Sequence, residues 1–456
     1  MEKPNILFII ADDHTHRAVG AYGNTVVKTP ALDHLAERGT AFLENRIMGG
    51  MNGAVCVPTR ACVLTGVNVF QAIDYKNSKS AIHPELSILP EVFRRAGYHT
   101  FATGKWHNDR QSFARGFTDA RKVMFGGMSK HEEVPVQDFD PSGQYPDSRK
   151  VIEGTFSSEL FGNAAIDFIR GYDRENPFFL YLAFTAPHDP RTPPKEYADM
   201  YDPKQIPLPE NYMSDHPFDN GELYSIRDEK LESWPRRPEA ILRHIADYYG
   251  MISHMDAQIG RVVQALKDKG LLENTVIVYT ADHGISIGQH GLMGKQNVYD
   301  HSIRVPLIVC GPGLPAGKKI RSLTYTYDIF PTLCELAGVP VPAQVDAESL
   351  LPLMDGSKHA VRDTVFTMYK EFQRSVTDGR WKLIRYYRSV KKNVGTDRIQ
   401  LFDLQEDPWE TRDLSQEPAH RERIAQLAVE LKKWQIRLRD PLADLPVVPP
   451  EAGGSQ

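Results

Sequence analysis

The stretch Gly53-Ala-Val-Cys56-Val-Pro58-Thr-Arg60-Ala-Cys-Val-Leu64-Thr65-Gly66 is the part of the chain around which the rest is organised. It places a thiol, a rigid proline and a guanidinium within five positions, at the expected start of a helix. An arginine close to a cysteine favours a thiolate or an anionic substrate. A buried structural cysteine beside a turn proline is the alternative, and the spacing alone leaves both interpretations open.

Size and composition limit the class of protein. The chain has 456 residues, which predicts two domains, and a formal net charge of -5. Because no broad basic excess is present to neutralise phosphates, we expect no nucleic-acid partner. The hydrophobic share of 41% is ordinary for a globular protein, and no run is long and apolar enough to cross a bilayer.

The cysteines and the first residues bear on the compartment. Four cysteines, at positions 56, 62, 310 and 334, form neither a disulfide framework nor a CxxC zinc pattern. The N-terminal residues lead directly into an expected strand and lack the features of a secretory leader. We therefore expect a cytoplasmic protein as the sequence stands, or a periplasmic or secreted one if a leader has been removed.

Continuous apolar runs predict the strands of a mostly parallel sheet that is buried on both faces. These runs cover residues 6–10, 98–103, 178–184, 275–280 and 305–309. Helical patterns fall between them, at residues 29–39, 87–97 and 157–170 and in a long helix with apolar positions from Ile241 to Leu266. Residues 108–155 and 191–238 are expected to be long loops. The prediction is an α/β domain over residues 1–360, with a large mixed sheet sandwiched by helices.

The pattern changes near Ala360. Residues 376–384 alternate in polarity around an expected hairpin turn at Asp378-Gly379, and residues 401–404 form another short strand. A helix is expected from about Glu417 to Leu438. We therefore predict a C-terminal subdomain over residues 361–456, with a small antiparallel sheet, one helix, and a tail from Pro449.

Polar residues directly follow four of the expected strands. In chain order they are Asp12 and Asp13, Lys105 and His107, His188, and Asp282 and His283. The carboxyl edge of an open α/β sheet is where ligands bind. Any one of these residues alone would be interpreted as a solvated turn or a satisfied loop histidine. Because all of them fall at strand ends, the set favours an active site, and the adjacent carboxylates favour a metal.

These residues together resemble the sulfatase family. Cys56-x-Pro58-x-Arg60 followed by Leu64-Thr65-Gly66 resembles the family signature, with Thr59 where serine is commoner. Further matches are Asp12-Asp13, Gly104-Lys105-Trp106-His107, Ala186-Pro187-His188, Asp282-His283-Gly284, Gly294-Lys295-x-x-x-Tyr299-Asp300, Tyr327-Asp328-Ile-Phe-Pro331-Thr332 and Leu401-Phe-Asp-Leu-x-x-Asp407-Pro408. The resemblance covers nearly the whole chain and implies an alkaline-phosphatase-like fold.

The resemblance implies hydrolysis of a sulfate monoester, expected to be a sulfated sugar. It implies that a formylglycine-generating enzyme, or an equivalent maturase, converts Cys56 to formylglycine (3-oxoalanine), whose hydrated aldehyde is the nucleophile. Lys105 and Arg60 would hold this group and its charge. His188, with Lys295, would bind the sulfate and protonate the leaving alcohol. His107 would then remove a proton and regenerate the aldehyde.

The resemblance also implies one divalent cation, held by Asp12, Asp13, Asp282, His283 and the modified residue at position 56. The family precedent is Ca²⁺, and hard carboxylates suit Ca²⁺ or Mg²⁺. A histidine ligand is unusual for calcium, so Mg²⁺ and Mn²⁺ stay open. Such a cation, together with Lys105, Lys295 and Arg60, outweighs the three aspartates and suits an anionic ester.

Two other functions remain open from the sequence. The first is a phosphonate monoester or phosphodiester hydrolase of the same superfamily, which uses the same modified residue. The second is a non-catalytic protein that binds sulfated glycans, which an unmodified Cys56 would favour. Parallel assays with sulfate and phosphate aryl esters separate the first of these from a sulfatase.

Overall fold

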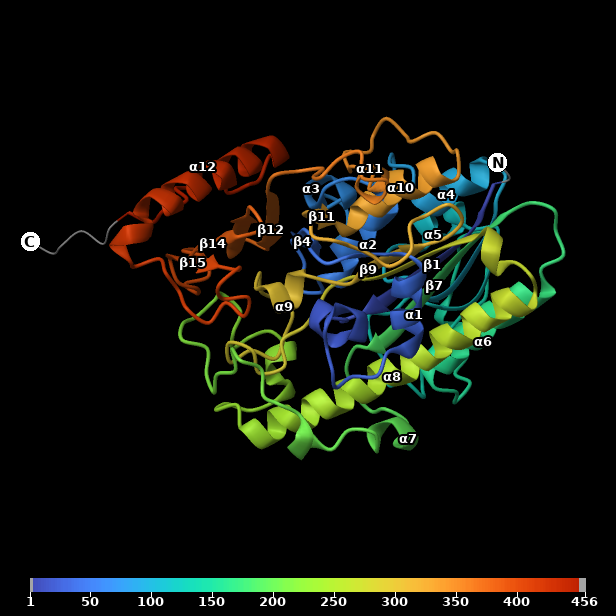
Figure 1. Cartoon of the computed structure of the whole chain (residues 1–456), viewed down its shortest axis with the longest axis horizontal. Helices are drawn as coiled ribbons and strands as arrows, with labels where there is room; N and C mark the ends of the chain where they lie inside the picture. The colour runs from blue at the N-terminus through green and yellow to red at the C-terminus, as the bar shows by residue number, and fades with distance from the viewer. Residues whose placement is uncertain (1–2, 451–456) are drawn as a thin grey trace, which may run out of the picture.

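An eight-stranded mixed sheet forms the centre of the molecule (Figure 1). The computed structural model describes residues 3–450. In spatial order the strands are β10 (Lys318–Ile320), β2 (Thr40–Phe42), β9 (Leu307–Cys310), β8 (Thr275–Ala281), β1 (Asn5–Asp12), β7 (Phe178–Pro187), β5 (His99–Lys105) and β6 (Asp119–Met124). The strands from β8 to β6 run parallel, whereas β9 is antiparallel to both β8 and β2. The large, mostly parallel sheet predicted from the apolar runs is therefore present.

Helices cover both faces of this sheet, and the side chains of β1 show why. Alternate residues of the strand point to opposite faces. Ile6 and Phe8 belong to one apolar cluster, and Leu7 and Ile9 belong to another. The first cluster includes residues of α2 (Cys56–Thr65), α4 (Leu89–Arg95) and α10 (Ile329–Leu336). The second includes residues of α1 (Pro30–Arg38), α6 (Ser157–Gly171) and α8 (Pro238–Asp268), which lie together along one side in Figure 1.

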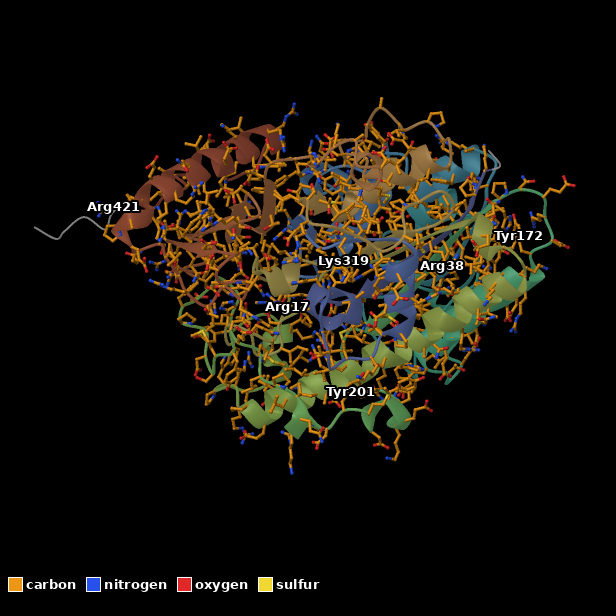
Figure 2. All side chains as sticks on the ribbon, viewed as in Figure 1. Arg17, Arg38, Tyr172, Tyr201, Lys319 and Arg421 are labelled. Carbon is orange, nitrogen blue, oxygen red and sulfur yellow. The ribbon has the colours of Figure 1, made fainter. Side chains whose placement is uncertain are left out.

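The longest helix, α8, follows the predicted periodicity. It begins at Pro238, a residue suited to the first helical position. Its buried positions recur at helical spacing from Ile241 to Leu266, so one stripe of the helix packs against the core. Tyr201, labelled in Figure 2, contacts the Ser253 hydroxyl on this helix.

A second, five-stranded sheet lies toward the C-terminal end. Its spatial order is β15 (Arg398–Asp403), β14 (Trp381–Tyr386), β13 (Gln373–Thr377), β12 (Val365–Tyr369) and β4 (Gly49–Gly50). The strands from β12 to β15 are antiparallel, as predicted, and β13 and β14 are joined through Asp378-Gly379. Helix α12 (Arg421–Leu438) contacts β13 and β14.

The strand β4 comes from the N-terminal half of the chain and pairs parallel with β12. A side chain at Gly50 would clash with the ring of Pro58 in α2, so only glycine allows this close approach. The small sheet is therefore completed by residues that lie a few positions before Cys56.

The structure corrects the prediction of one long loop. Residues 108–155, expected to be a long loop, contain the helix α5 (Arg110–Gly116) and the edge strand β6, which pairs with β5. Asp109 caps α5 by accepting a hydrogen bond of 2.7 Å from the Ser112 N–H. Because β6 is an edge strand of mixed burial, it lacks the continuous apolar run that revealed the central strands.

The remaining strands and α-helices are short. They are β3 (Asn45–Arg46) paired with β11 (Thr324–Tyr325), and the helices α3 (Val69–Ala72), α7 (Lys195–Ala198), α9 (Asp300–Ile303) and α11 (Leu351–Met354). Of the predicted tail from Pro449, residues 451–456 lie outside the described part of the chain. Within residues 3–450, no helix has the length and apolarity needed to span a membrane.

Candidate active site

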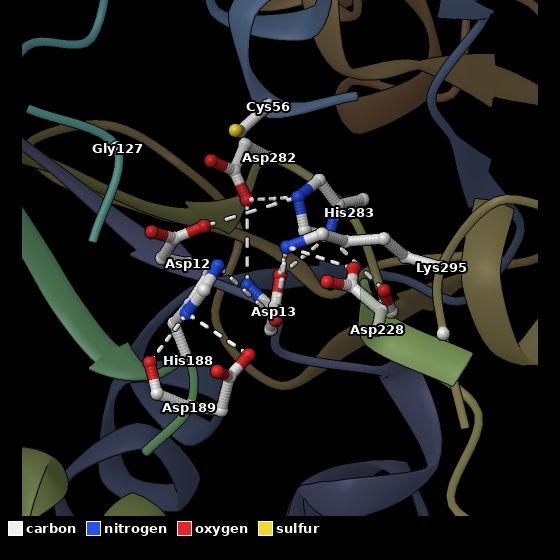
Figure 3. A network of polar contacts seen from close by, with 12 residues as sticks. Asp12, Asp13, Cys56, Gly127, His188, Asp189, Asp228, Asp282, His283 and Lys295 are labelled. Atoms are coloured by element: carbon white, nitrogen blue, oxygen red, sulfur yellow. Dashed lines mark hydrogen bonds and ion pairs between the residues drawn. The ribbon is translucent and has the colours of Figure 1, made fainter. Parts of the chain in front are cut away.

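The strand ends bring the predicted polar residues to one edge of the large sheet (Figure 3). Asp12 ends β1, Lys105 ends β5, and His188 and Asp282 each follow the last residue of a strand. The first residue of α2, Cys56, points into the same place. All of these side chains are buried.

One group of these side chains has the composition of a metal site. Donor atoms of Asp12, Cys56, Asp282 and His283 all lie within 4.8 Å of one another. His283 Nε2 is 3.8 Å from Asp12 Oδ1 and 3.5 Å from Asp282 Oδ1. Within residues 3–450, neither His283 Nε2 nor Asp12 Oδ1 has a hydrogen-bond partner, although both are buried. Buried polar atoms without a partner are costly, so these converging donors fit a divalent cation.

The pKa shifts of these side chains are consistent with a cation site. Burial would lower the pKa of His283, but the carboxylates of Asp282 and Asp13 raise it to about 10. Burial and the charge of Asp12 together raise the pKa of Asp282. The neighbouring carboxylates thus stabilise positive charge at His283, a position at which a metal cation can take the place of the proton.

The neighbouring lysines keep the first two carboxylates ionised. Burial alone would raise the pKa of Asp12, but Lys105 and His188 hold it below the ordinary value, and Lys105 Nζ donates to Asp12 Oδ2. Burial likewise opposes ionisation of Asp13, whose pKa is held low by His188 and Lys295. Lys295 Nζ donates to Asp13 Oδ1 over 2.8 Å. Both acids are therefore available as charged ligands.

The surroundings of Cys56 favour its anionic form. The side chain is only 1% exposed, and Sγ lies 3.0 Å from His107 Nδ1. Burial would raise the pKa of the thiol, but His107 and Lys105 hold it well below the ordinary value. His107 has a positive φ of 64°, and a methyl group added at Gly127 would lie 2.7 Å from His107 Nε2. Gly127 therefore leaves room for this ring beside Cys56.

Arg60 connects Asp282, which follows β8, with Lys105, which ends β5. It lies one turn after Cys56 on α2, where Nε donates to Asp282 Oδ2 over 2.8 Å and Nη1 donates to the Lys105 carbonyl over 2.9 Å. Helix α2 thus fixes the thiol and the guanidinium in one rigid element. The remaining nitrogen, Nη2, is buried and has no partner among the described residues.

His188 and Lys295 lie on the side of Asp13. His188 Nδ1 is 2.7 Å from the carbonyl of Asp189, while Nε2 is 3.9 Å from Asp13 Oδ2. The Nε2 atom therefore faces the site. Burial would lower the pKa of Lys295, but Asp13 and Asp228 raise it well above the ordinary value, so this lysine carries a fixed positive charge.

Several residues around the site were missed by sequence reasoning. Asp189 accepts from Arg227 through both oxygens, at 2.6 and 2.9 Å, and Asp228 lies 4.0 Å from Lys295 Nζ. Glu229 accepts the backbone N–H groups of the loop just before Lys295, at 2.9 Å each. Three of these four residues belong to the proline-rich segment 191–238, which has no periodicity. Only Asp189 could have been recognised from the sequence, because it directly follows His188.

A second group of possible ligands, His290, His301 and Glu410, lies outside this site. Its carboxylate is already neutralised, since Glu410 Oε1 accepts from Lys382 Nζ over 2.7 Å and Oε2 accepts from a backbone N–H over 2.8 Å. We assign no metal to it.

Comparisons with known proteins find matches that together cover most of the chain. The family model described as Sulfatase matches residues 4–339, and the model described as N-sulphoglucosamine sulphohydrolase, C-terminal, matches residues 288–437. An arylsulfatase of Clostridium perfringens is 30% identical over 92% of this chain and 92% of its own length. An N-acetylglucosamine-6-O-sulfatase of Bacteroides thetaiotaomicron is 25% identical over 96% of this chain and 87% of its own.

Solved structures share the fold. One, of a protein in complex with its substrate D-glucosamine-2-N,6-O-disulfate, has a TM-score of 0.80 at 22% identity, covering 98% of this chain and 99% of the other. A phosphonate monoester hydrolase of Agrobacterium radiobacter has a TM-score of 0.76 at 23% identity, with coverage of 96% and 95%. The family match over most of the chain, with the site at the carboxyl edge of the sheet, establishes that this chain belongs to the sulfatase family of sulfuric ester hydrolases.

Proposed function

We propose that this protein hydrolyses the sulfate ester of a sulfated carbohydrate, with Cys56 converted to formylglycine. The observation that carries the proposal is the position of Cys56, whose sulfur lies within 4.8 Å of donor atoms of Asp12, Asp282 and His283. A sugar sulfate is supported by the relative named as an N-acetylglucosamine-6-O-sulfatase. The modification requires a maturase as a partner of the newly made chain.

The residues that would hold the divalent cation are Asp12, Asp13, Asp282, His283 and the modified residue at position 56. We propose Ca²⁺, since hard carboxylates dominate this set, with Mg²⁺ and Mn²⁺ as the alternatives. When bound, such a cation supplies Lewis-acid stabilisation of negative charge and lowers the pKa of a coordinated hydroxyl group.

Positive side chains bind the anionic part of the substrate. Lys105 and Arg60 are rigidly held, by Asp12 and Asp282 respectively, and flank position 56. The Arg60 Nη2 group donates to no described residue, so it is available to donate a hydrogen bond to an oxygen of the side chain at position 56. Lys295 contributes its charge from the side of Asp13. Preorganised cations in a buried site stabilise charge that develops in the transition state.

Two histidines are placed to move protons. His188 is oriented by the hydrogen bond between Nδ1 and the Asp189 carbonyl, and the Asp189 carboxylate lies 3.3 Å from the same nitrogen. These contacts at Nδ1 fix the ring with Nε2 directed into the site, where it is placed to donate a proton to the leaving oxygen. On the other side, His107 Nδ1 lies 3.0 Å from the reacting side chain at position 56, where it can accept a proton.

The test uses protein co-expressed with a maturase and assayed in parallel with nitrophenyl sulfate, nitrophenyl phosphate and a phosphonate monoester. We expect the sulfate ester to be the preferred substrate. Preference for the phosphonate would support the alternative hydrolase of the same superfamily. Binding of sulfated sugars without turnover, by protein that retains the Cys56 thiol, would support a binding protein instead. A screen of defined sulfated mono- and disaccharides then identifies the sugar.

A further inference from the structure

A cleft of about 680 Å³ opens beside the start of α2 and has three cationic residues in its lining. These are Lys79, Lys370 and Arg439, and we call this feature the Lys79–Arg439 cleft. Its lining combines residues just before Cys56 with residues from the C-terminal part of the chain, including Pro441. The cleft is therefore formed only when the two parts of the chain are packed together.

The charge of the cleft is positive. Lys79 and Arg439 are exposed, and within residues 3–450 neither side chain has an ion-pair or hydrogen-bond partner. Lys370 is paired with Glu222, at 2.7 Å. No carboxylate is found among the described residues that line the cleft. Two cations without counter-charges thus face the same space.

The backbone that carries these cations is well fixed. Arg439 precedes Asp440, whose two carboxylate oxygens accept from Arg374 at 2.6 and 2.7 Å. The carbonyl of Lys79 accepts from the side chain of Asn52, another residue of the lining. The positions of the two charges are therefore determined by the fold, although their side chains are free to meet a ligand.

One residue of the cleft lining adjoins the reacting residue in the chain. Val57, which lines it, directly follows Cys56 in α2. Asn108 directly follows His107, and its Nδ2 donates to the carbonyls of Val57 and Ser80 at 3.2 and 3.1 Å. Both of these carbonyls belong to lining residues. The lining is therefore connected, through one peptide bond and through Asn108, to the two residues Cys56 and His107 of the site.

The lining is also partly apolar. Phe70 and Tyr75 are among its residues, so the cleft combines rings with cations. A site of this kind suits a sugar ring that carries an anionic substituent, because the ring contributes apolar C–H surface and the substituent pairs with the cations.

We propose that the Lys79–Arg439 cleft binds a second anionic group of the substrate, a sulfate or carboxylate on the sugar that adjoins the one being desulfated. The inference rests on the proposed function and deepens it, since it makes the preferred substrate an oligosaccharide with more than one anionic group. Rim charges of this kind act on binding and on its salt dependence.

The test is inhibition of nitrophenyl sulfate hydrolysis by a heparin tetrasaccharide, which carries anionic groups on neighbouring sugars. We expect inhibition of the wild-type enzyme and about a tenfold higher inhibition constant for the Lys79→Ala/Arg439→Ala double variant, which corresponds to about 1.4 kcal/mol. The Lys79→Arg/Arg439→Lys variant should retain the wild-type value. Lys76→Ala removes an exposed lysine outside the cleft and should leave inhibition unchanged.

The outcomes separate the two proposals. If the modified wild-type enzyme hydrolyses neither nitrophenyl sulfate nor any of the defined sulfated saccharides, the proposed function fails. If it hydrolyses one of these substrates, but the tetrasaccharide does not inhibit that reaction, or inhibits the double variant as strongly as the wild type, the cleft is not a binding site for a second anionic group. Unchanged thermal melting of each variant shows that the fold is retained.

Discussion

The Tyr248 hydroxyl donates a hydrogen bond of 2.6 Å to the backbone carbonyl of Asp13. The same hydroxyl accepts from the Thr15 N–H over 3.0 Å, so it joins two residues of the loop after β1. Asp13 has a positive φ of 70°, a conformation that most side chains disfavour. Helix α8 therefore stabilises, through one phenol, the backbone of a proposed metal ligand.

Replacing this phenol should weaken metal binding without unfolding the protein. We expect Tyr248→Phe to lower metal affinity by about 10- to 100-fold, as loss of partners behind metal ligands generally does. Calorimetric titration of the metal-free protein measures this directly. Tyr249→Phe is the matched control, since its hydroxyl contacts Asn24 rather than the loop of Asp13. Equal affinities in the two variants would show that Tyr248 does not position Asp13.

Cys56, and not Cys62, should carry the modification. Only Cys56 lies in the Cys-x-Pro-x-Arg register, which Cys62 lacks. Peptide mass spectrometry after co-expression with a maturase should detect the conversion of thiol to aldehyde at position 56 alone. Fully active protein with an intact Cys56 thiol would overturn the proposed nucleophile.

Asp13→Ala should lose both the metal and the activity. The substitution removes a proposed ligand and leaves Lys295 Nζ without its 2.8 Å partner. Elemental analysis should find one divalent ion per wild-type chain and none in the variant. Asp444→Ala, at an exposed position, is the control and should retain the ion. Two zinc ions per wild-type chain would point to a phosphatase instead.

His188→Ala should affect poor leaving groups most. A sugar hydroxyl needs a proton as it departs, whereas nitrophenolate hardly does. We expect the loss on a sugar sulfate to exceed the loss on nitrophenyl sulfate by about 10²–10⁴-fold, the range of general acid catalysis. Equal losses on both substrates would leave His188 as a residue that binds sulfate and remove its role as an acid.

Asp440→Asn should destabilise the C-terminal part of the molecule. The Arg374–Asp440 pair is fully buried, and removing one partner of such a pair costs about 3–5 kcal/mol. Burial would raise the pKa of Asp440, but the hydrogen bond from Arg374 lowers it below the ordinary value. Its contribution to stability is therefore complete above the unfolded pKa of about 3.9 and is lost as the pH falls through the folded value.

Urea unfolding at neutral pH and at successively lower pH measures both effects. The stability difference between the wild type and Asp440→Asn should shrink in acid, because protonation removes the same charge from the wild type. Asp444→Asn, which lies nearby and is exposed, is the control. A difference that stays constant down to the lowest pH would show that the charge of Asp440 is not what stabilises this region.

The central strands and the edge that carries the site were predictable, because parallel strands buried on both faces leave continuous apolar runs that end at polar residues. Asp12 and Asp282 were found in this way. Arg227 and Glu229 were not, since they reach the site by long-range contacts from a segment without periodicity. The two-residue strand β4 exists only through its partner β12, so no local pattern could reveal it.

The burial of α2 sets an order of events during synthesis. Every residue from Cys56 to Thr65 is buried in the folded protein, so a maturase can reach the Cys56 side chain only while this segment is still unpacked. The strand just before it, β4, finds its partner only when Met368 has been made. The last step that closes the sheet beside Cys56 must therefore wait for most of the chain to leave the ribosome. Under the proposed modification, this delay would give a maturase a period in which the thiol is still accessible.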